Sequence, residues 1–243
     1  MYSSPAVPRV VSHRGLHSAF PENSLPAFEA AIAAGAWGIE LDVHGSLDSE
    51  LFVHHDASLA VGGRDTPFIE MDSRDVRNFR LPGDVPIPTL DQVLAAIGAR
   101  ANVFIEIKAR GIEEAVARCL KRHIANADRY AVHAFDHRIV KRMLELAPSI
   151  RTGVLQVSYL LDSVGAMRRA GASDLWQHSD FIDSALVADV HAAGGRIVAW
   201  TPNTPAKWDE LADMGVDVIC TDPVDACAEW ALSRADANDE LYT

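Results

Sequence analysis

The sequence predicts an α/β fold in which parallel strands close into a TIM (β/α)8 barrel, with a small β-hairpin and loop excursion after the second strand. Two observations lead to this prediction. Short apolar runs alternate with stretches whose apolar residues recur at helical spacing, and glycine closes several of those stretches. The runs number eight, which is the number of strands that closes a barrel of this kind. Alternation alone does not demonstrate closure, so an open doubly wound sheet is the alternative.

The strand and helix signals follow one another along the chain. The apolar and often β-branched runs begin near Val10, Trp37, Val103, Tyr130, Thr152, Asp174, Ile197 and Val216. The helical spacings cover residues 24–34, 90–99, 112–124, 137–146, 183–193 and 205–214. A chain of 243 residues, 49% of them hydrophobic, supplies a sizeable core, and no linker or repeat divides it. We therefore expect one domain over residues 1–243.

One further run breaks this rhythm. The run from Leu51 to His54 follows the strand that ends near Val43 after only a short polar turn. It is therefore expected to pair with that strand as an antiparallel hairpin. The segment from Ala57 to Pro88 is rich in glycine, proline and charge, and is predicted to be a loop excursion with room for one helical turn.

The charge balance restricts the partners of the protein. The chain carries 22 Lys and Arg against 34 Asp and Glu, which gives a net charge of −12. An acidic protein is poorly suited to bind nucleic acid or to dock on anionic membranes. A small-molecule substrate that is anionic would have its charge met locally, by a metal ion or by a few basic side chains. The oligomeric state is left open.

The cysteines and the apolar runs indicate the compartment. None of Cys119, Cys220 and Cys227 belongs to a C-x-x-C pair, which favours buried thiols in a reducing compartment. No apolar run approaches the length of a membrane span, and the start MYSSPAVPRVVSHRG lacks the features of a signal peptide. We expect a cytoplasmic protein.

Ionisable residues recur at the carboxyl ends of separate predicted strands, where barrels of this type build their active sites. Residues two apart in a strand share a face, which places Glu40 beside Asp42, and Glu106 beside Lys108. Neighbouring carboxylates repel one another, and their burial is unfavourable unless a metal ion, a basic side chain or solvent compensates them. The three carboxylates of Glu40, Asp42 and Glu106 suit a hard divalent cation.

Histidine and basic side chains complete this candidate site. His13 and Arg14 end the first predicted strand, and His55 follows the hairpin. The two histidines are suited to proton transfer, since an unperturbed imidazole titrates near neutrality. Arg14 and Lys108 are suited to hold an anionic group.

Each of these residues also has a structural alternative. Glu40 or Asp42 alone could be paired with Arg14 or Lys108 in an ion-pair network. A lone His13 would more often be a core or capping histidine. What favours a functional site is the coincidence of all these residues on the ends of the first three strands and the hairpin.

Other polar and aromatic residues are interpreted as structural. A lone Trp200 is more often part of a core than of a binding platform. Asp222, which precedes Pro223, is interpreted as a helix N-cap. The histidines assigned to the structural class are His44, His54, His123, His137 and His191.

In combination these motifs resemble the glycerophosphodiester phosphodiesterase family. The resemblance rests on the segments HRG, PENS, ELD, HHD, IPTL and EIK in that order, and on AFDHRIV and VAWTPN further along. It extends from Val10 to about Ala226. The combination is specific, although each segment alone is weak.

The resemblance implies a metal-dependent barrel enzyme that hydrolyses glycerophosphodiesters to glycerol 3-phosphate and an alcohol. The divalent cation is expected to be magnesium or calcium. Matched position by position, the family's acid–base histidines correspond to His13 and His55, its metal ligands to Glu40, Asp42 and Glu106, its phosphate-binding residues to Arg14 and Lys108, and its apolar wall to Trp200.

The resemblance leaves several points open. The turn at residues 46–49, the run at residues 57–64 and Ala134 depart from the family pattern. The 57–64 run lacks the family's threonines and so its substrate contacts, and the head group of the substrate is not predicted. The nucleophile is either water or the glycerol 2-hydroxyl, and either histidine could be the acid. A lysophospholipase D-like activity on lipid-linked diesters is an alternative that would need an apolar entrance. A non-catalytic glycerophosphodiester-binding barrel is a second alternative, but binding alone would not need an acid–base pair.

Overall fold

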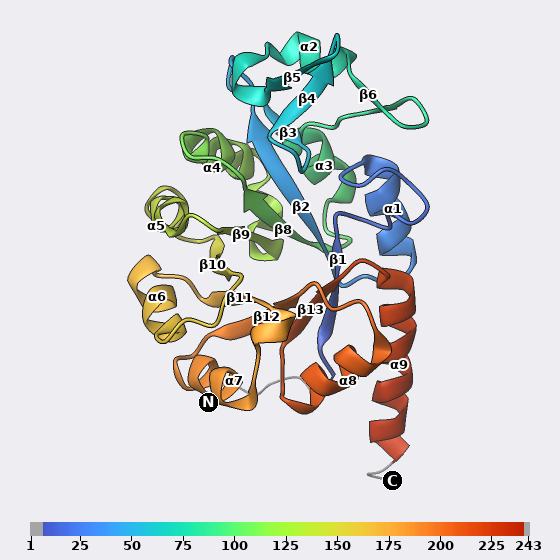
Figure 1. The fold of residues 1–243 in the computed structure, drawn as a ribbon, viewed down its shortest axis with the longest axis vertical. Helices are drawn as coiled ribbons and strands as arrows, with labels where there is room; N and C mark the ends of the chain where they lie inside the picture. Colours follow the sequence, from blue (N-terminus) through green and yellow to red (C-terminus); the bar gives the residue numbers. More distant parts are fainter. Residues whose placement is uncertain (1–6, 241–243) are drawn as a thin grey trace.

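The computed structural model describes residues 7–240, and the side chains of residues 7–236. Eight parallel strands form a closed ring in the order β1-β13-β12-β11-β10-β9-β8-β2, and the pairing of β2 with β1 closes it (Figure 1). The barrel strands are β1 (Arg9–His13), β2 (Gly38–Gly45), β8 (Asn102–Ile107), β9 (Tyr130–Ala134), β10 (Arg151–Gln156), β11 (Asp174–His178), β12 (Arg196–Trp200) and β13 (Val218–Thr221). The predicted barrel is confirmed, and the open-sheet alternative is wrong. The expectation that the start of the sequence is not a signal peptide falls partly on residues 1–6, which lie outside the described residues.

Helices surround the ring of strands (Figure 1). They are α1 (Leu25–Ala33), α3 (Leu90–Ile97), α4 (Glu113–Arg122), α5 (His137–Leu146), α6 (Ser163–Ala170), α7 (Ser184–Ala192), α8 (Pro205–Asp213) and α9 (Val224–Glu240). Short 3-10 turns lie at η2 (Ile124–Arg129) and η3 (Ser179–Phe181). Six of the helices fall on the predicted ranges, whereas α6 and α9 were not predicted. None of the helices in the described part of the chain is long and apolar enough to cross a membrane.

The interior of the barrel is filled by side chains rather than left open. Inward-facing residues of registered strands pack as one buried cluster, consisting of Val11, Phe104, Ala131, Leu155, Trp176, Val198, Val218 and Cys220. Gly153 makes room for the largest of them, because a Cβ at this position would lie 2.7 Å from Cδ1 of Trp176. A larger apolar cluster fills the space between the strands and the helices. The candidate site residues of the inward face lie at the carboxyl ends of the strands, beyond this cluster.

The segment between the second and third barrel strands is more ordered than the sequence predicts. β3 (Leu51–Val53) pairs antiparallel with β2, which confirms the expected hairpin. Residues 57–88 are not a loop but contain the two-stranded sheets β4–β5 and β6–β7, a 3-10 turn and a short helix, which lie at the top of Figure 1. Their bounds are β4 (Ser58–Val61), β5 (Arg64–Pro67), η1 (Phe68–Glu70), α2 (Ser73–Asn78), β6 (Arg80–Leu81) and β7 (Val85–Pro86).

The physical reason for this order is a small separate core. Phe68 and Val76 pack with Phe52 of β3, together with Leu59, Met71 and Ile87. Gly62 and Gly63, both with positive φ, form the tight turn that joins β4 to β5. Apolar residues spaced irregularly among glycines and prolines gave no periodic signal for these elements.

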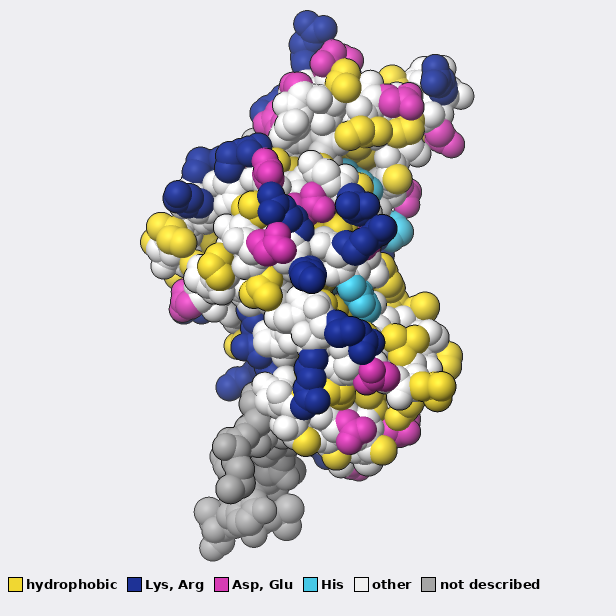
Figure 2. Space-filling model, turned by 90° about the vertical axis from the view of Figure 1, so that its left-hand side faces the viewer, with side chains coloured by type: hydrophobic (Ala, Val, Ile, Leu, Met, Phe, Trp, Pro, Cys, Tyr) yellow, Lys and Arg dark blue, Asp and Glu magenta, His cyan; other side chains and the backbone are white. Residues whose placement is uncertain are grey.

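The surface charge is distributed unevenly. Figure 2 shows that Lys and Arg side chains gather on the face that carries α4, α5 and α6, although the net charge of the chain is −12. Acidic partners lie among them, for example Glu114, which pairs with Arg118 and Arg142. The net negative charge of the chain is therefore not spread evenly, and this face is rich in basic side chains.

Candidate active site

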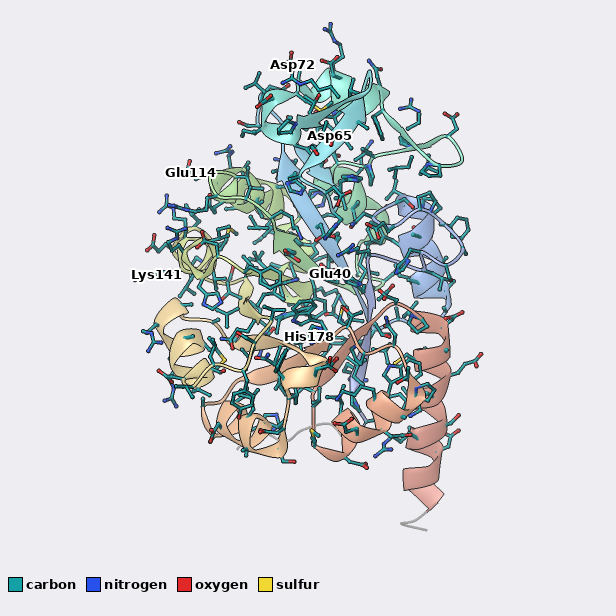
Figure 3. All side chains as sticks on the ribbon, in the orientation of Figure 1. Glu40, Asp65, Asp72, Glu114, Lys141 and His178 are labelled. Atoms are coloured by element: carbon teal, nitrogen blue, oxygen red, sulfur yellow. The ribbon has the colours of Figure 1, made fainter. Side chains whose placement is uncertain are left out.

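A cavity of about 110 Å³ opens at the carboxyl ends of the barrel strands. Glu40 lies near the centre of the ring of strands, while Glu114 and Lys141 point outward from the helices (Figure 3). Seven of the eight predicted site residues line this cavity, namely His13, Arg14, Glu40, His55, Glu106, Lys108 and Trp200. The eighth, Asp42, is buried beside it. Parallel register brings them together, because Asp42 lies opposite Glu106 and Glu40 lies opposite His13.

Asp42 is held by a set of polar and basic side chains. Its Oδ2 accepts a hydrogen bond of 2.9 Å from Nδ2 of Asn23 and lies 3.2 Å from Nε of Arg14. Its Oδ1 lies 3.2 Å from Nζ of Lys108. Burial raises the pKa of Asp42, but the charges of Lys108 and Arg14 and the hydrogen bond from Asn23 outweigh burial and lower it. The ion-pair alternative considered for Asp42 is therefore present in the structure.

Glu40 and Glu106 are less fully compensated. Burial, followed by the charge of Asp42, raises the pKa of Glu40 to about 7. The same two causes raise the pKa of Glu106, although its Oε1 lies 2.9 Å from Nζ of Lys108. Oε2 of Glu40 is buried and has no hydrogen-bond partner among the described residues. A buried, incompletely neutralised pair of carboxylates fits a divalent cation.

The ligand atoms that converge most closely are those of Glu40, Glu106 and His133. One such atom from each residue lies within 4.8 Å of the other two, and all three residues are buried. Asp42 does not belong to this group, since its oxygens are turned toward Arg14, Lys108 and Asn23. His133 was not singled out by the sequence. The alternation of β9 and its register opposite Glu106 are the signals that would have placed it in the site.

His13 is positioned by the last strand of the barrel. Its Nδ1 lies 2.6 Å from Oδ1 of Asp222, which also lies 3.1 Å from Nε2 of His17. Oδ2 of Asp222 accepts a hydrogen bond of 2.6 Å from Asn203. Burial lowers the pKa of His13, but the hydrogen bond to Asp222 and the charge of Glu40 outweigh it, so the pKa is raised.

The interpretation of Asp222 as a helix N-cap is wrong for its side chain. The hydrogen bonds of its carboxylate run to His13, His17 and Asn203 rather than to the backbone of α9. The Asp-Pro pair resembles a helix start in sequence, and only closure of the barrel brings Asp222 beside His13. This residue was missed as part of the site.

His55 lies on the loop after β3, across from the strand that carries His13. Its Nδ1 is 2.9 Å from Oδ1 of Asp56, and the side chain is about one-third exposed at the cavity. The backbone here is tied down at two points: the carbonyl of His55 is 3.1 Å from Nε2 of His44, and the N–H of His54 donates to the carbonyl of Asp42. His44 therefore supports the site from behind, as a structural histidine.

Aromatic rings form one side of the cavity mouth. Trp200 contacts Phe135 and His178 edge to face, with ring centroids 5.6 Å and 5.3 Å apart. Phe135 also lines the cavity and follows β9 directly. Trp200 thus lines the cavity together with Phe135, which was not predicted.

A barrel whose mouth combines buried carboxylates, two basic side chains and two histidines has the composition of a site for metal-assisted phosphoryl transfer. Residues 13–226 match the model of the glycerophosphoryl diester phosphodiesterase family, and the chain belongs to this family of phosphoric diester hydrolases.

Relatives of known name agree with this assignment. The chain is 32% identical to the "Probable glycerophosphodiester phosphodiesterase 2" of Mycobacterium tuberculosis, over 93% of this chain and 91% of the relative. It is 29% identical to a glycerophosphodiester phosphodiesterase of Bacillus altitudinis, over 88% and 94% of the two chains.

Solved structures share the fold. A glycerophosphodiester phosphodiesterase from Parabacteroides distasonis superposes with a TM-score of 0.83 at 26% identity, covering 93% of this chain and 98% of that one. An Oleispira antarctica phosphodiesterase, solved with the product sn-glycerol-3-phosphate, superposes with a TM-score of 0.82 at 22% identity, covering 95% and 97%.

Proposed function

We propose that the protein hydrolyses glycerophosphodiesters to glycerol 3-phosphate and an alcohol, with a divalent cation, magnesium or calcium, held by Glu40, Asp42 and Glu106. The observation that carries this proposal is the convergence of buried carboxylates and two histidines on one cavity, in a chain of this family. A bound cation would supply Lewis-acid stabilisation of the phosphate charge. Arg14 and Lys108 would hold the phosphate oxygens, and Trp200 would pack against the glycerol or leaving-group side.

His13 and His55 are assigned to proton transfer. His13 meets Asp222 through Nδ1, which leaves Nε2 to face the cavity, and its raised pKa favours the protonated form. We therefore assign His13 as the acid that protonates the leaving alcohol and His55 as the base that takes a proton from the nucleophile.

The function is tested by measuring release of glycerol 3-phosphate from glycerophosphocholine and glycerophosphoethanolamine, before and after exhaustive treatment with EDTA. We expect release that is lost on chelation and restored by added cation. No release from either substrate would overturn the proposed reaction, and full turnover after chelation would overturn the role of the metal.

The histidine roles are tested with a p-nitrophenyl diester, whose leaving group needs no protonation. His13→Ala is expected to be largely rescued by this substrate, whereas His55→Ala is not. Both variants should lose about 10²- to 10⁴-fold in kcat with the natural diester. Rescue of His55→Ala alone would reverse the assignment, and equal rescue of both would contradict a division of labour.

One observation favours the lipid-linked alternative as a second candidate. Exposed apolar side chains rim the same end of the barrel on the loops after β9, β10 and β11, namely Phe135, Val157, Tyr159, Leu160, Leu161 and Phe181. The relatives named above are glycerophosphodiester phosphodiesterases, which does not favour this alternative. Assays of lysophosphatidylcholine and glycerophosphocholine side by side decide between the two functions. A higher kcat/KM for the lipid would make it the preferred substrate in place of the water-soluble diester.

We also propose that the protein acts in the cytoplasm. Its three cysteines are free and buried, as expected for a reducing compartment. Fractionation of the source cells with an antibody against the protein tests this location, and recovery outside the cytoplasmic fraction would contradict it.

A further inference from the structure

We propose that His133 is a direct ligand of the cation, so that the site combines an imidazole nitrogen with carboxylate oxygens and prefers first-row transition cations such as Mn²⁺ and Co²⁺ over Ca²⁺ and Mg²⁺. This inference rests on the proposed metal site but concerns which residue holds the cation and which cation is held. It adds a ligand that the family resemblance does not supply.

The position of His133 is set by the barrel itself. It lies on β9 directly opposite Glu106 of β8, with both side chains on the inward face. Its Nε2 lies 3.7 Å from Oε1 of Glu40. One ligand atom each from His133, Glu40 and Glu106 lies within 4.8 Å of the others, which is the separation at which three donors can share one ion. The three residues are 1%, 3% and 9% exposed.

The ring of His133 is fixed in orientation by its neighbour. It stacks on Trp176 with ring centroids 4.0 Å apart and planes 8° from parallel. Trp176 in turn occupies the space that Gly153 leaves free. This packing fixes the plane of the imidazole while its Nε2 lies 3.7 Å from Glu40.

A purely structural histidine would be expected to have hydrogen-bond partners. His44, His123 and His137 each lie within 3.1 Å of an oxygen that pairs with the ring nitrogen. His133 is almost fully buried, and its Nδ1 has no hydrogen-bond partner among the described residues. Nε2 lies 3.7 Å from Oε1 of Glu40, too far for a hydrogen bond, and its lone pair is therefore available to a cation shared with that oxygen.

The donor set determines the preferred cation. Calcium and magnesium favour sites made entirely of oxygen ligands. Imidazole suits the later first-row metals, whose affinity for mixed nitrogen and oxygen sites rises along the series from Mn²⁺ to Cu²⁺. An imidazole nitrogen added to the carboxylate oxygens therefore makes the site less suited to calcium, which the family resemblance alone does not predict.

Pulsed electron paramagnetic resonance of the Mn²⁺-loaded protein tests direct ligation without reference to activity. We expect ¹⁴N modulation typical of a coordinated imidazole in the unmodified protein. The modulation should disappear in His133→Gln and persist in His13→Gln, the matched variant of a second histidine that lines the cavity. Absence of the modulation from the unmodified protein, or its loss in His13→Gln alone, would overturn the proposal.

Metal affinities measured by calorimetry test the preference. His133→Gln should lower the affinity for Mn²⁺ and Co²⁺ by about 10-fold or more. Even residues that only orient a metal ligand typically contribute about 10- to 100-fold to metal affinity. Ca²⁺ affinity should change much less. The control His191→Gln alters a partly buried histidine of α7 that pairs with Asp217, outside the cavity and the ligand group, and should leave all these affinities unchanged. Equal weakening of every cation by His133→Gln would mean that His133 acts through packing, contrary to the proposal.

The outcome is separable from that of the proposed function. Release of glycerol 3-phosphate without ¹⁴N modulation would retain the reaction and reject His133 as a ligand. Modulation without any release would retain the ligand and reject the reaction. Circular dichroism of each variant establishes that it is folded before it is compared.

Discussion

At the scale of single residues, the carboxylates of the site differ in how many hydrogen-bond and ion-pair partners offset their charge. Asp222 is shared by His13, His17 and Asn203, and Asp42 is shared by Arg14, Asn23 and Lys108. Glu40 has no comparable set of partners. The three carboxylates therefore respond differently to substitution, and each difference can be measured.

Asp222→Asn tests the support of His13. The substitution removes a negative charge that favours the imidazolium, so the pKa of His13 should fall. The limb of the pH profile of kcat/KM that belongs to His13 should move to lower pH, with a fall in kcat of about 10-fold or more. A fall in kcat with the limb unmoved would indicate a purely structural role for Asp222.

Glu40→Gln tests the need for the central carboxylate. We expect kcat/KM to fall by about 10² to 10³, the effect of removing one electrostatic contact from a transition state, together with weaker cation binding. Circular dichroism should be unchanged. Activity within tenfold of the unmodified enzyme would contradict the role of Glu40 as a ligand.

The same substitution should affect the pH dependence of stability in the absence of metal. The folded pKa of Glu40 is raised to about 7, above the ordinary value of 4.5. The folded state therefore holds the proton more tightly, and stability falls as pH rises from about 4.5 to 7. Urea unfolding in the presence of EDTA measures this. The free energy of unfolding of Glu40→Gln minus that of the unmodified protein should be larger at pH 8 than at pH 5. A difference independent of pH would be contrary to this expectation.

The cysteines should take no part in the chemistry. Burial raises the pKa of the Cys119 thiol to about 11 and that of Cys227 to about 12, and raises that of Cys220 as well. Because the thiolate is the reactive form, iodoacetamide at pH 7 should leave both the thiols and the activity unchanged under native conditions. Mass spectrometry of the treated protein checks this, and a modified thiol accompanied by loss of turnover would be evidence against it.

At the scale of elements, the strands and helices with a regular apolar pattern could be predicted, and those without one could not. The eight strand starts and six helices were predicted because their apolar residues recur regularly. The helix α6 is only eight residues long and contains Gly165, and it begins because Asp162 accepts a hydrogen bond of 2.8 Å from that glycine. Such a local cap leaves little trace in a hydrophobic pattern.

The start of α3 offers a direct test of local capping. Thr89 and Gln92 form a reciprocal capping box, in which the Thr89 hydroxyl accepts from the N–H of Gln92 and the Gln92 side chain accepts from the N–H of Thr89. Thr89→Ala should destabilise the protein by about 1 kcal/mol in urea unfolding. Thr89→Ser should be close to neutral, and equal losses in both variants would contradict a capping role.

For the site, strand alternation predicted the residues on the first three strands, and the later strands supplied the ones that were missed. Glu40, Asp42, Glu106 and Lys108 are two apart within their strands and so could be placed from sequence alone. His133 and Asp222 acquire their meaning only from the register of β9 and from the meeting of β13 with β1. Such contacts between distant segments carry no local pattern.

At the scale of the whole molecule, stability and chemistry are built at opposite ends of the barrel. Asp174 begins β11, where its buried carboxylate pairs with Arg151 and Arg196 at 2.7 Å each. These residues start three neighbouring strands, at the ends opposite to the carboxyl ends that hold the site.

Asp174→Ala should therefore lower stability without altering the site. Removing Asp174 leaves the partly exposed guanidinium groups of Arg151 and Arg196 without their shared partner, and loss of a hydrogen bond to a charged group typically costs about 1.5–3 kcal/mol. Urea unfolding should detect this loss, while cation affinity and kcat/KM at a temperature where the variant is folded should be unchanged. A matching loss of cation affinity would mean that the two ends of the barrel are coupled.

The pairing of the first strand with the last also has a consequence for synthesis on the ribosome. His13 is made before the other strands of the barrel, yet the carboxylate that orients it is 209 positions further along the chain. While translation is under way, β1 lacks one of its two neighbours and presents an open edge, of the kind that invites pairing with other chains. A nascent chain stalled before β13 would thus hold all three proposed metal-binding carboxylates but not Asp222, so the proposed acid His13 would lack its orienting partner until the ring has closed.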